Sequence, residues 1–483
     1  MAGGVAPGAG SENATHDGKN YTGPLIIVTL LFFMWGFITC LNDIIMPKLQ
    51  SVFALNNVET ALVQFCFFGA YFIISLLYFI VSVSGSDPIQ KIGYKKTIVI
   101  GLIVSGIGCL LFYPASEIES FPIFLGALFV LASGITILQM GANPYVALLG
   151  KPETSSGRLN MTQAFNSLGT TVAPLMGIII FSGGETDHSS HSVEMPYILL
   201  ACTLGALALL ISRAKLPAVT TGNGEKVVGS ALKYRHLALG VLCIFMYVGG
   251  EVSIGSFLVK YLGLENIAGF NESQASPYLS LFWGGAMVGR FYGAVFMSKM
   301  SKNNTTLYII GIVVFSFLLG LFFTDVDITL SAVFSGLALL NLLAFFIGKN
   351  NPNTTLGLFG FAVMVLLLLG VTMDGQFAMW SIISIGLFNS IMFPTIFTLA
   401  IKGLGNHTSQ GASLLVMAIV GGALIPLIHG FVADVLAFDP STGLGHKNNF
   451  QLAYVVPMFC YLYIAYYGFI GSKPKEGQLQ ATS

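Results

Sequence analysis

Charged residues are scarce in this sequence. Only 9% of its 483 residues are Asp, Glu, Lys or Arg, whereas an ordinary soluble domain has about 25%. The 21 basic and 21 acidic residues balance, and no basic stripe suggests binding to nucleic acid. Hydrophobic residues make up 55% of the chain, in runs long enough to cross a bilayer. The composition therefore predicts an all-α polytopic membrane protein.

Motifs for nucleotide binding and hydrolysis are also absent. The chain has no G-x-x-x-x-G-K-[ST], no H-E-x-x-H and no G-x-S-x-G, which argues against a pump or an intramembrane protease. The six cysteines lie in apolar runs without metal-ligand spacing. His188 and His191 share a loop, but no set of acidic or Cys ligands completes a metal site there. We therefore expect no enzyme activity, no cofactor and no metal.

Apolar runs near the roughly 20 residues that cross a bilayer predict fourteen spans. The first six are expected at 24–47, 60–84, 97–115, 121–149, 158–182 and 197–213, and the other eight at 236–262, 276–299, 306–324, 328–348, 355–373, 376–401, 411–437 and 450–471. The predicted domains are a flexible tail at 1–22, an N-terminal half at 23–213, a linker at 214–235, a C-terminal half at 236–472 and a tail at 473–483.

Basic residues predict the orientation of these spans. All but three of the 21 Lys and Arg residues fall on one side when the N-terminus is placed inside, and cytoplasmic loops are where Lys and Arg accumulate. The three exceptions are Lys48, Lys260 and Lys447. We expect a multi-pass protein, monomeric, with both termini in the cytoplasm.

An internal repeat relates the two predicted halves. Phe67-Phe-Gly-Ala70 resembles Phe282-Trp-Gly-Gly285, and Gly169-Thr-Thr-Val-Ala-Pro-Leu175 resembles Gly421-Gly-Ala-Leu-Ile-Pro-Leu427. The offset grows from 215 residues between Gly69 and Gly284 to 252 residues between Pro174 and Pro426. The difference predicts two extra helices within 306–373. Halves repeated in parallel, with a binding site between them, are typical of major-facilitator transporters.

Glu251 is the carboxylate that the sequence marks most clearly. It lies midway along an otherwise uncharged run from Leu237 to Val259, where a charge costs roughly 2.5–3.5 kcal/mol on insertion scales. Gly249 and Gly250 precede it and predict a place where the helix opens or a ligand approaches. We interpret Glu251 as a site residue; the alternative is a structural acid paired with a neighbouring helix.

Amide side chains inside the predicted spans suggest a sugar site. An Asn or Gln side chain both donates and accepts hydrogen bonds without a net charge, as a sugar hydroxyl does. Aromatic rings suit the apolar faces of sugars. The alternative is that the amides join helices and the rings pack or face lipid. The predicted sugar-binding residues are Gln139, Asn143, Gln163, Asn166, Glu251, Trp283, Asn389 and Phe393.

Two further positions carry charge near the ends of predicted spans. Asp43, with Asn42 beside it, lies near the outer end of the first span, so it is either interfacial or a cation-coupling residue. We predict Asp43, Asn42 and Glu251 as the coupling residues. Arg290 lies near the inner end of its span, and we predict that it anchors a gate between helices.

Six motifs in chain order resemble the bacterial fucose/galactose/glucose symporter family of the major facilitator superfamily, and within it the glucose/galactose transporters. They are Leu41-Asn-Asp-Ile-Ile-Met-Pro47, Gln64-Phe-Cys-Phe-Phe-Gly-Ala-Tyr-Phe72, Gln139-Met-Gly-Ala-Asn-Pro144, Gln163-Ala-Phe-Asn-Ser-Leu-Gly169, Tyr247-Val-Gly-Gly-Glu251 and Phe388-Asn-Ser-Ile-Met-Phe-Pro-Thr-Ile-Phe397. The resemblance implies a major-facilitator fold of two six-helix halves, alternating access and cation-driven hexose uptake across a bacterial inner membrane.

The resemblance also implies roles for single residues. Asp43 matches an acid that serves proton coupling in the fucose-transporting branch, while Gln139 stands where that branch has a Glu. Glu251 matches the Glu of the glucose/galactose branch, and Gln163 and Asn166 match sugar-contacting amides. Gln139 cannot titrate but keeps an oxygen ligand, which favours sodium over protons as the co-transported cation. A proton mechanism through Glu251 stays open.

The expected function is therefore a cation-coupled hexose symporter, with a glucose- or galactose-like substrate. One alternative is a transporter of an amino sugar such as N-acetylglucosamine, because the same amides suit an acetamido group. The other is a sugar sensor that does not translocate its ligand.

Overall fold

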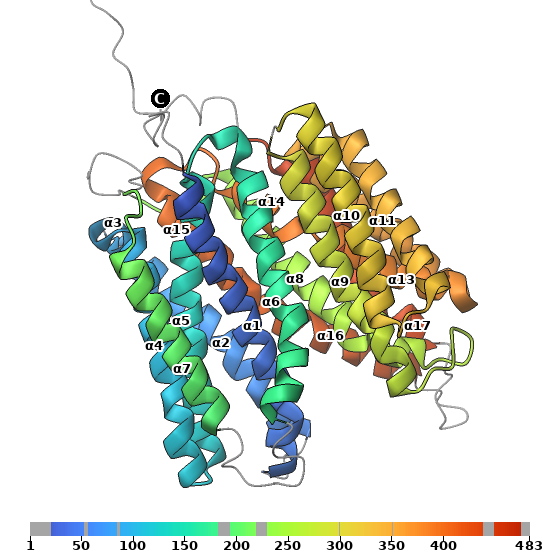
Figure 1. The fold of residues 1–483 in the computed structure, drawn as a ribbon, viewed down its shortest axis with the longest axis horizontal. Coiled ribbons are helices and arrows are strands. Elements are labelled where there is room, and N and C mark those ends of the chain that lie inside the picture. The colour runs from blue at the N-terminus through green and yellow to red at the C-terminus, as the bar shows by residue number, and fades with distance from the viewer. Residues whose placement is uncertain are drawn as a thin grey trace, which may run out of the picture.

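The computed structural model describes residues 21–52, 57–84, 87–181, 194–218, 229–298, 300–349, 351–437 and 449–474. Side chains are described in these segments except at 41–52, 57–61, 174–181, 194, 436–437 and 449. All regular structure in the described segments is helical, and the long helices run side by side (Figure 1).

The described residues of the first half form six long α-helices and one short one. They are α1 (Thr22–Val52), α2 (Asn57–Val83), the short α3 (Pro88–Ile92), α4 (Tyr94–Glu117), α5 (Phe121–Leu148), α6 (Ser155–Phe181) and α7 (Glu194–Arg213). Helix α4 packs against α5 and α7, and α1 packs against α6. The α4–α5 contact is close: a Cβ at Gly108 would lie 2.4 Å from the backbone nitrogen of Leu131.

The second half contains more helices. They are α8 (Arg235–Leu262), α9 (Glu272–Phe296), α10 (Lys302–Phe323), α11 (Ile328–Gly348), α12 (Pro352–Thr372), α13 (Gly375–Asn389), α14 (Met392–Ala400), α15 (Thr408–Met417), α16 (Gly421–Ala437), α17 (Asn449–Leu452) and α18 (Val455–Tyr466). Helix α12 packs against α13 and α18, as α4 packs against α5 and α7 in the first half. The hairpin of α10 and α11 packs on α9 at the edge of the bundle (Figure 1).

The predicted number of fourteen spans is wrong. Among the described residues, twelve helical segments are long and apolar enough to cross a bilayer. The predicted spans 158–182 and 276–299, which correspond to α6 and α9, are not among them. Both helices have a lower mean hydropathy than most of their neighbours, because polar side chains lie along them where the two halves meet. The lengths of the apolar runs alone did not reveal this difference in mean hydropathy.

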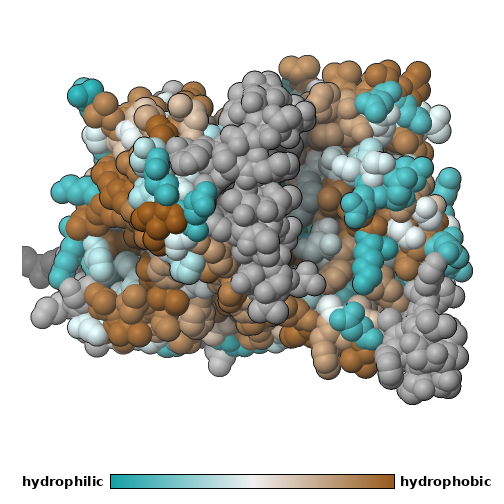
Figure 2. Space-filling model, turned by 90° about the horizontal axis from the view of Figure 1, so that it is seen from below, coloured by the Kyte–Doolittle hydropathy of each residue, from teal (hydrophilic) through white to brown (hydrophobic). Residues whose placement is uncertain are grey.

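Large apolar side chains cover the outside of the bundle. Ile26 is 63% exposed, Leu307 68% and Phe431 70%, and Figure 2 shows apolar side chains over much of the surface seen from below. Exposed apolar surface on this scale is costly in water and is satisfied by lipid. The surface therefore agrees with a protein embedded in a membrane.

The two halves contact each other through a few helices. Helix α6 packs against α9 and α14, and α15 packs against α2 and α5. Several hydrogen bonds cross between the halves, including Ser156 with Thr398 at 2.7 Å and Ser409 with Asp87. These residues lie at the same end of the molecule as Lys151 and Lys402 in the connecting loops and Arg158 in the first turn of α6. That end of the bundle is closed by contacts between the halves.

The close packing of α4 on α5 yields a test of the fold. Gly108→Ala places a methyl group against the Leu131 backbone, which cannot move without shifting α5, so we expect a loss of about 1–3 kcal/mol of stability. Gly126→Ala on α5 is the matched control, because a Cβ there meets nothing within 4 Å. Thermal unfolding of the purified variants measures both. Equal melting temperatures for the two variants would contradict this packing.

Candidate functional site

Glu251 lies half-buried on α8 and accepts a hydrogen bond from a tyrosine of the same helix. The Tyr247 hydroxyl lies 2.7 Å from Glu251 Oε1, because residues four apart share one face of a helix. The same hydroxyl lies 3.2 Å from the backbone oxygen of Asn389. A tyrosine hydroxyl has one hydrogen to donate. Tyr247 therefore stands between a carboxylate and a backbone carbonyl.

The Asn389 carbonyl is available because the helix breaks there. Helix α13 ends at Asn389 and α14 begins at Met392, so carbonyls in the last turn of α13 have no helical partner. The Ser390 oxygen accepts a hydrogen bond from Arg290 Nε at 3.0 Å. The Leu387 oxygen accepts one from Asn341 Nδ2 at 3.1 Å. Side chains from α8, α9 and α11 thus satisfy the break.

A second tyrosine orients the Asn389 side chain. The Tyr461 hydroxyl, on α18, donates to Asn389 Oδ1 at 2.7 Å. Asn389 is fully buried, and its Nδ2 has no hydrogen-bond partner among the described residues. The amide therefore presents an unused donor close to Glu251.

Arg290 links this cluster to the other half of the protein. Its Nη1 donates to the Ser167 hydroxyl on α6, while its Nε holds the helix break of the second half. Gly289 permits the close approach of α9, because a Cβ there would lie 2.6 Å from the Leu387 oxygen. Arg290 thus contacts both halves at once.

The predicted amides of the first half lie on α5 and α6. Gln163 Nε2 lies 3.5 Å from Asn143 Oδ1, and Gln139 Nε2 donates to the Tyr71 hydroxyl at 2.8 Å. Gln139 Oε1 and Asn143 Nδ2 are buried without a described partner. Asn166 Nδ2 donates to the Phe32 carbonyl on α1 at 2.9 Å. Asn166 therefore joins helices, whereas Gln139 and Asn143 retain unused hydrogen-bonding capacity.

The two predicted aromatic residues differ in position. Trp283 is 40% exposed and packs against Gly255, where a Cβ would lie 2.7 Å from its ring. Gly255 is one helical turn beyond Glu251, so the indole lies near the carboxylate. Phe393 is buried and stacks on Phe397 with ring centroids 6.0 Å apart.

The expected opening of α8 is not present. Helix α8 is continuous from Arg235 to Leu262, and its glycines instead permit close packing. A Cβ at Gly249 would lie 2.3 Å from Ile425 on α16, and one at Gly250 would lie 3.1 Å from Tyr461 on α18. The helix that breaks is the one carrying Asn389. The side chains of Asn42 and Asp43 lie outside the described residues.

Sequence reasoning did not find several residues of this cluster. Tyr71 lies inside a quoted motif, but nothing in the motif indicated that its hydroxyl accepts a hydrogen bond from Gln139. Tyr461 is one of several tyrosines near the C-terminus, and no pattern distinguishes it. Asn341 and Ser167 each looked like ordinary polar residues of an apolar helix. Their partners are backbone carbonyls or distant side chains, which no local spacing reveals.

Comparison with known proteins agrees with this architecture. The Major Facilitator Superfamily pattern matches residues 25–356. The chain is 45% identical over 466 residues to a glucose/galactose transporter of Brucella abortus, covering 95% of this chain and 96% of the relative. The chain belongs to the major facilitator superfamily. It is also 39% identical to a putative glucose/galactose transporter of Helicobacter pylori, covering 93% of this chain and 97% of the relative.

A solved structure of a superfamily member matches the whole fold. The transporter FucP in the outward conformation superposes with a TM-score of 0.72 at 27% identity, covering 93% of this chain and 99% of that one. The L-fucose-proton symporter of Escherichia coli is 28% identical, with 92% of each chain covered. The resemblance to the fucose/galactose/glucose family is therefore confirmed, and the match supports twelve spans in place of the predicted fourteen.

The Tyr461–Asn389 hydrogen bond can be tested by removing one hydroxyl. Tyr461→Phe leaves the buried Asn389 oxygen without its donor, so we expect a loss of roughly 0.6–1.7 kcal/mol of stability. Tyr466→Phe is the matched control, because its hydroxyl forms an exposed contact with Arg235 at 3.2 Å. Reversible unfolding in mixed detergent measures the difference. A loss of the same size in both variants would argue against the assigned hydrogen bond.

Proposed function

We propose that this protein is a cation-coupled symporter of a glucose- or galactose-like hexose, working by alternating access. The observation that carries the proposal is the half-buried Glu251 carboxylate beside a broken helix, hydrogen-bonded through Tyr247. A carboxylate at this depth is energetically costly, and such residues are therefore rare unless they have a function. The identity of 45% to a glucose/galactose transporter supports the choice of substrate.

The proposed sugar site lies between the halves. Gln139, Asn143 and Gln163 contribute amides from the first half, and Asn389 contributes an unpaired Nδ2 from the second. The exposed face of Trp283 suits stacking on the apolar face of a pyranose. Asn166 holds α6 against α1 and positions Gln163 one turn away. An amino sugar such as N-acetylglucosamine is the second candidate, since the unpaired amide donors also suit an acetamido oxygen.

We propose protons as the co-transported cation. The sequence-based preference for sodium depended on Gln139, which cannot titrate but keeps an oxygen ligand. In the structure α8 is a continuous helix through Gly249 and Gly250, so it frees no backbone carbonyls there to complete a sodium site. An L-fucose-proton symporter is among the relatives of this chain. A proton on Glu251 would remove its charge and weaken the hydrogen bond from Tyr247, which favours donation of the Tyr247 hydroxyl to the Asn389 carbonyl and links the charge of the site to the helix break. Asp43 on α1 remains the second proposed coupling residue.

The closed end of the bundle is the proposed cytoplasmic side. The cationic loops gather there, as cytoplasmic loops do, and both termini would then lie in the cytoplasm of a bacterial inner membrane. Arg290 would hold α9 and α6 together while this end is closed. The fit to a relative in the outward conformation supports the same assignment.

The charge of Glu251 can be removed while its shape is kept. Glu251→Gln still accepts the Tyr247 hydrogen bond, so we expect an intact fold and retained hexose exchange. Concentrative uptake in proteoliposomes should disappear, because coupling needs a group that changes charge. Glu272→Gln, an exposed carboxylate at the start of α9, is the control and should accumulate sugar normally.

The same vesicles distinguish the cation and the sensor alternative. We expect a pH gradient to drive uptake in the absence of sodium. Uptake that requires a sodium gradient would instead identify sodium as the co-transported cation. A protein that binds sugar without any counterflow would be a sensor. Full accumulation of sugar by the Glu251→Gln variant would show that Glu251 has no role in coupling.

The sugar site is tested through the Gln163–Asn143 pair. Gln163→Ala removes a buried donor and acceptor, and a sugar hydroxyl left without its partner costs about 1–3 kcal/mol. Calorimetry with glucose, galactose and N-acetylglucosamine should therefore show weaker binding, with one of the three sugars preferred by the wild type. Asn303→Ala on the exposed start of α10 is the control. Wild-type affinity in Gln163→Ala would exclude this pair.

A further inference from the structure

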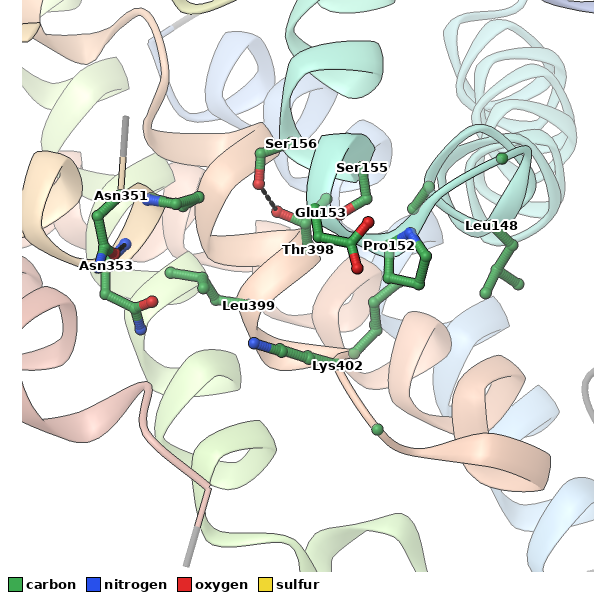
Figure 3. Close-up of a pocket in the computed structure, with 15 residues that line it drawn as sticks. Leu148, Pro152, Glu153, Ser155, Ser156, Asn351, Asn353, Thr398, Leu399 and Lys402 are labelled. Atoms are coloured by element: carbon green, nitrogen blue, oxygen red, sulfur yellow. Dashed lines mark hydrogen bonds between the residues drawn. The ribbon is translucent and has the colours of Figure 1, made fainter. Parts of the chain in front are cut away.

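A cavity of about 520 Å³ lies at the closed end of the bundle, away from Glu251. One wall comes from the first half, where the α5–α6 connection contributes Glu153 and Ser155. The other comes from the second half, with Lys402 after α14 and Asn353 at the start of α12 (Figure 3). The hydrogen bond between Ser156 and Thr398 joins the two walls at 2.7 Å.

This cavity is separate from the proposed transport site. Thr398 follows Asn389 by nine residues of largely helical chain, which corresponds to roughly 13 Å. Close packing lies between them: a Cβ at Gly157 would be 2.7 Å from the Met297 carbonyl oxygen. Asn160 Nδ2 also contacts Met297 Sδ at 3.6 Å. A sugar bound in the central site therefore does not extend into this cavity, and the two sites are distinct.

The lining of the cavity fits an anion that also carries hydroxyl groups. Lys402 extends toward the middle of the cavity (Figure 3), and in the described part of the chain its ammonium has no carboxylate within 4 Å. The charged side chains that line the cavity are Lys402 and Glu153. An ammonium suits a phosphate as a point charge. The Glu153 carboxylate and the Ser155 hydroxyl suit sugar hydroxyls.

We propose that this cavity binds a phosphorylated hexose from the cytoplasm and that binding slows transport. The proposal rests on the hexose symport proposed above. Opening of this end would move Ser156 away from Thr398 and divide the cavity between the halves. A ligand that contacts both walls therefore binds the closed state better, and such differential affinity shifts the population toward that state. The inhibition is noncompetitive, because the central site stays free.

Direct binding is measured on the purified full-length protein. Glucose 6-phosphate is the probe, with inorganic phosphate and glucose as comparisons in titration calorimetry. We expect Lys402→Ala to weaken binding of the probe at least about tenfold, since it removes the lining cation. Lys302→Ala, on the exposed first turn of α10 at the same end, is the matched control and should bind as the wild type does. Glu153→Gln should weaken the binding of glucose 6-phosphate but leave the binding of inorganic phosphate unchanged.

Three results of this titration would overturn the proposal. The first is the absence of binding by the wild type at millimolar probe. The second is equal binding by Lys402→Ala and Lys302→Ala. The third is inorganic phosphate binding as tightly as the probe, which would mean an adventitious ion only.

Transport supplies the functional measurement. Glucose 6-phosphate on the side of the closed end should lower the maximal rate of hexose exchange without changing its KM in the wild type. The Lys402→Ala variant should exchange hexose at the wild-type rate, and glucose 6-phosphate should not lower that rate. Unaltered exchange by wild type saturated with the probe would overturn the regulatory role. Binding of the probe by a protein that exchanges no hexose would instead reject the transport proposal and keep the cavity site.

Discussion

The break between α13 and α14 is the constraint on which the rest of the site depends. In a bilayer, a backbone carbonyl without a partner is costly, so irregular backbone persists only where the protein satisfies it. Arg290 and Asn341 each donate to a carbonyl at the break, and the Tyr247 hydroxyl lies between a third carbonyl there and Glu251. These donors come from three different helices. The positions of α8, α9 and α11 relative to one another therefore follow from the need to satisfy one broken helix.

The same interactions connect the carboxylate to the contact between the halves. Tyr247 shares its hydroxyl between Glu251 and the break, and Arg290 shares its guanidinium between the break and Ser167 on α6. A change in the charge of Glu251 thus acts on a hydrogen bond that is two side chains away from the first half. No rearrangement of α8 itself is needed. Such a short chain of hydrogen bonds can act without moving α8, whose glycines pack it tightly against α16 and α18.

The sequence was informative where scarcity made a residue stand out. A single carboxylate in a long apolar run identified Glu251, and spacing placed Asn143 and Gln163 on neighbouring helices. Glycine was ambiguous, because Gly249 and Gly250 serve close packing and not an opening of the helix. The span count was wrong because α6 and α9 carry polar side chains at the contact between the halves. Tyr461 was missed since its partner is 72 residues away along the chain.

The α10–α11 hairpin contributes more to the site than its place at the edge suggests. Its sequence is almost wholly apolar, and α10 contacts mainly α9 and α11. Yet Asn341 of α11 is fully buried and donates to the Leu387 carbonyl, while its own Oδ1 has no described partner. The Ser390 hydroxyl also donates to that carbonyl at 2.6 Å, so the Asn341 amide is its second donor. The hairpin is thus part of what stabilises the broken helix that carries Asn389.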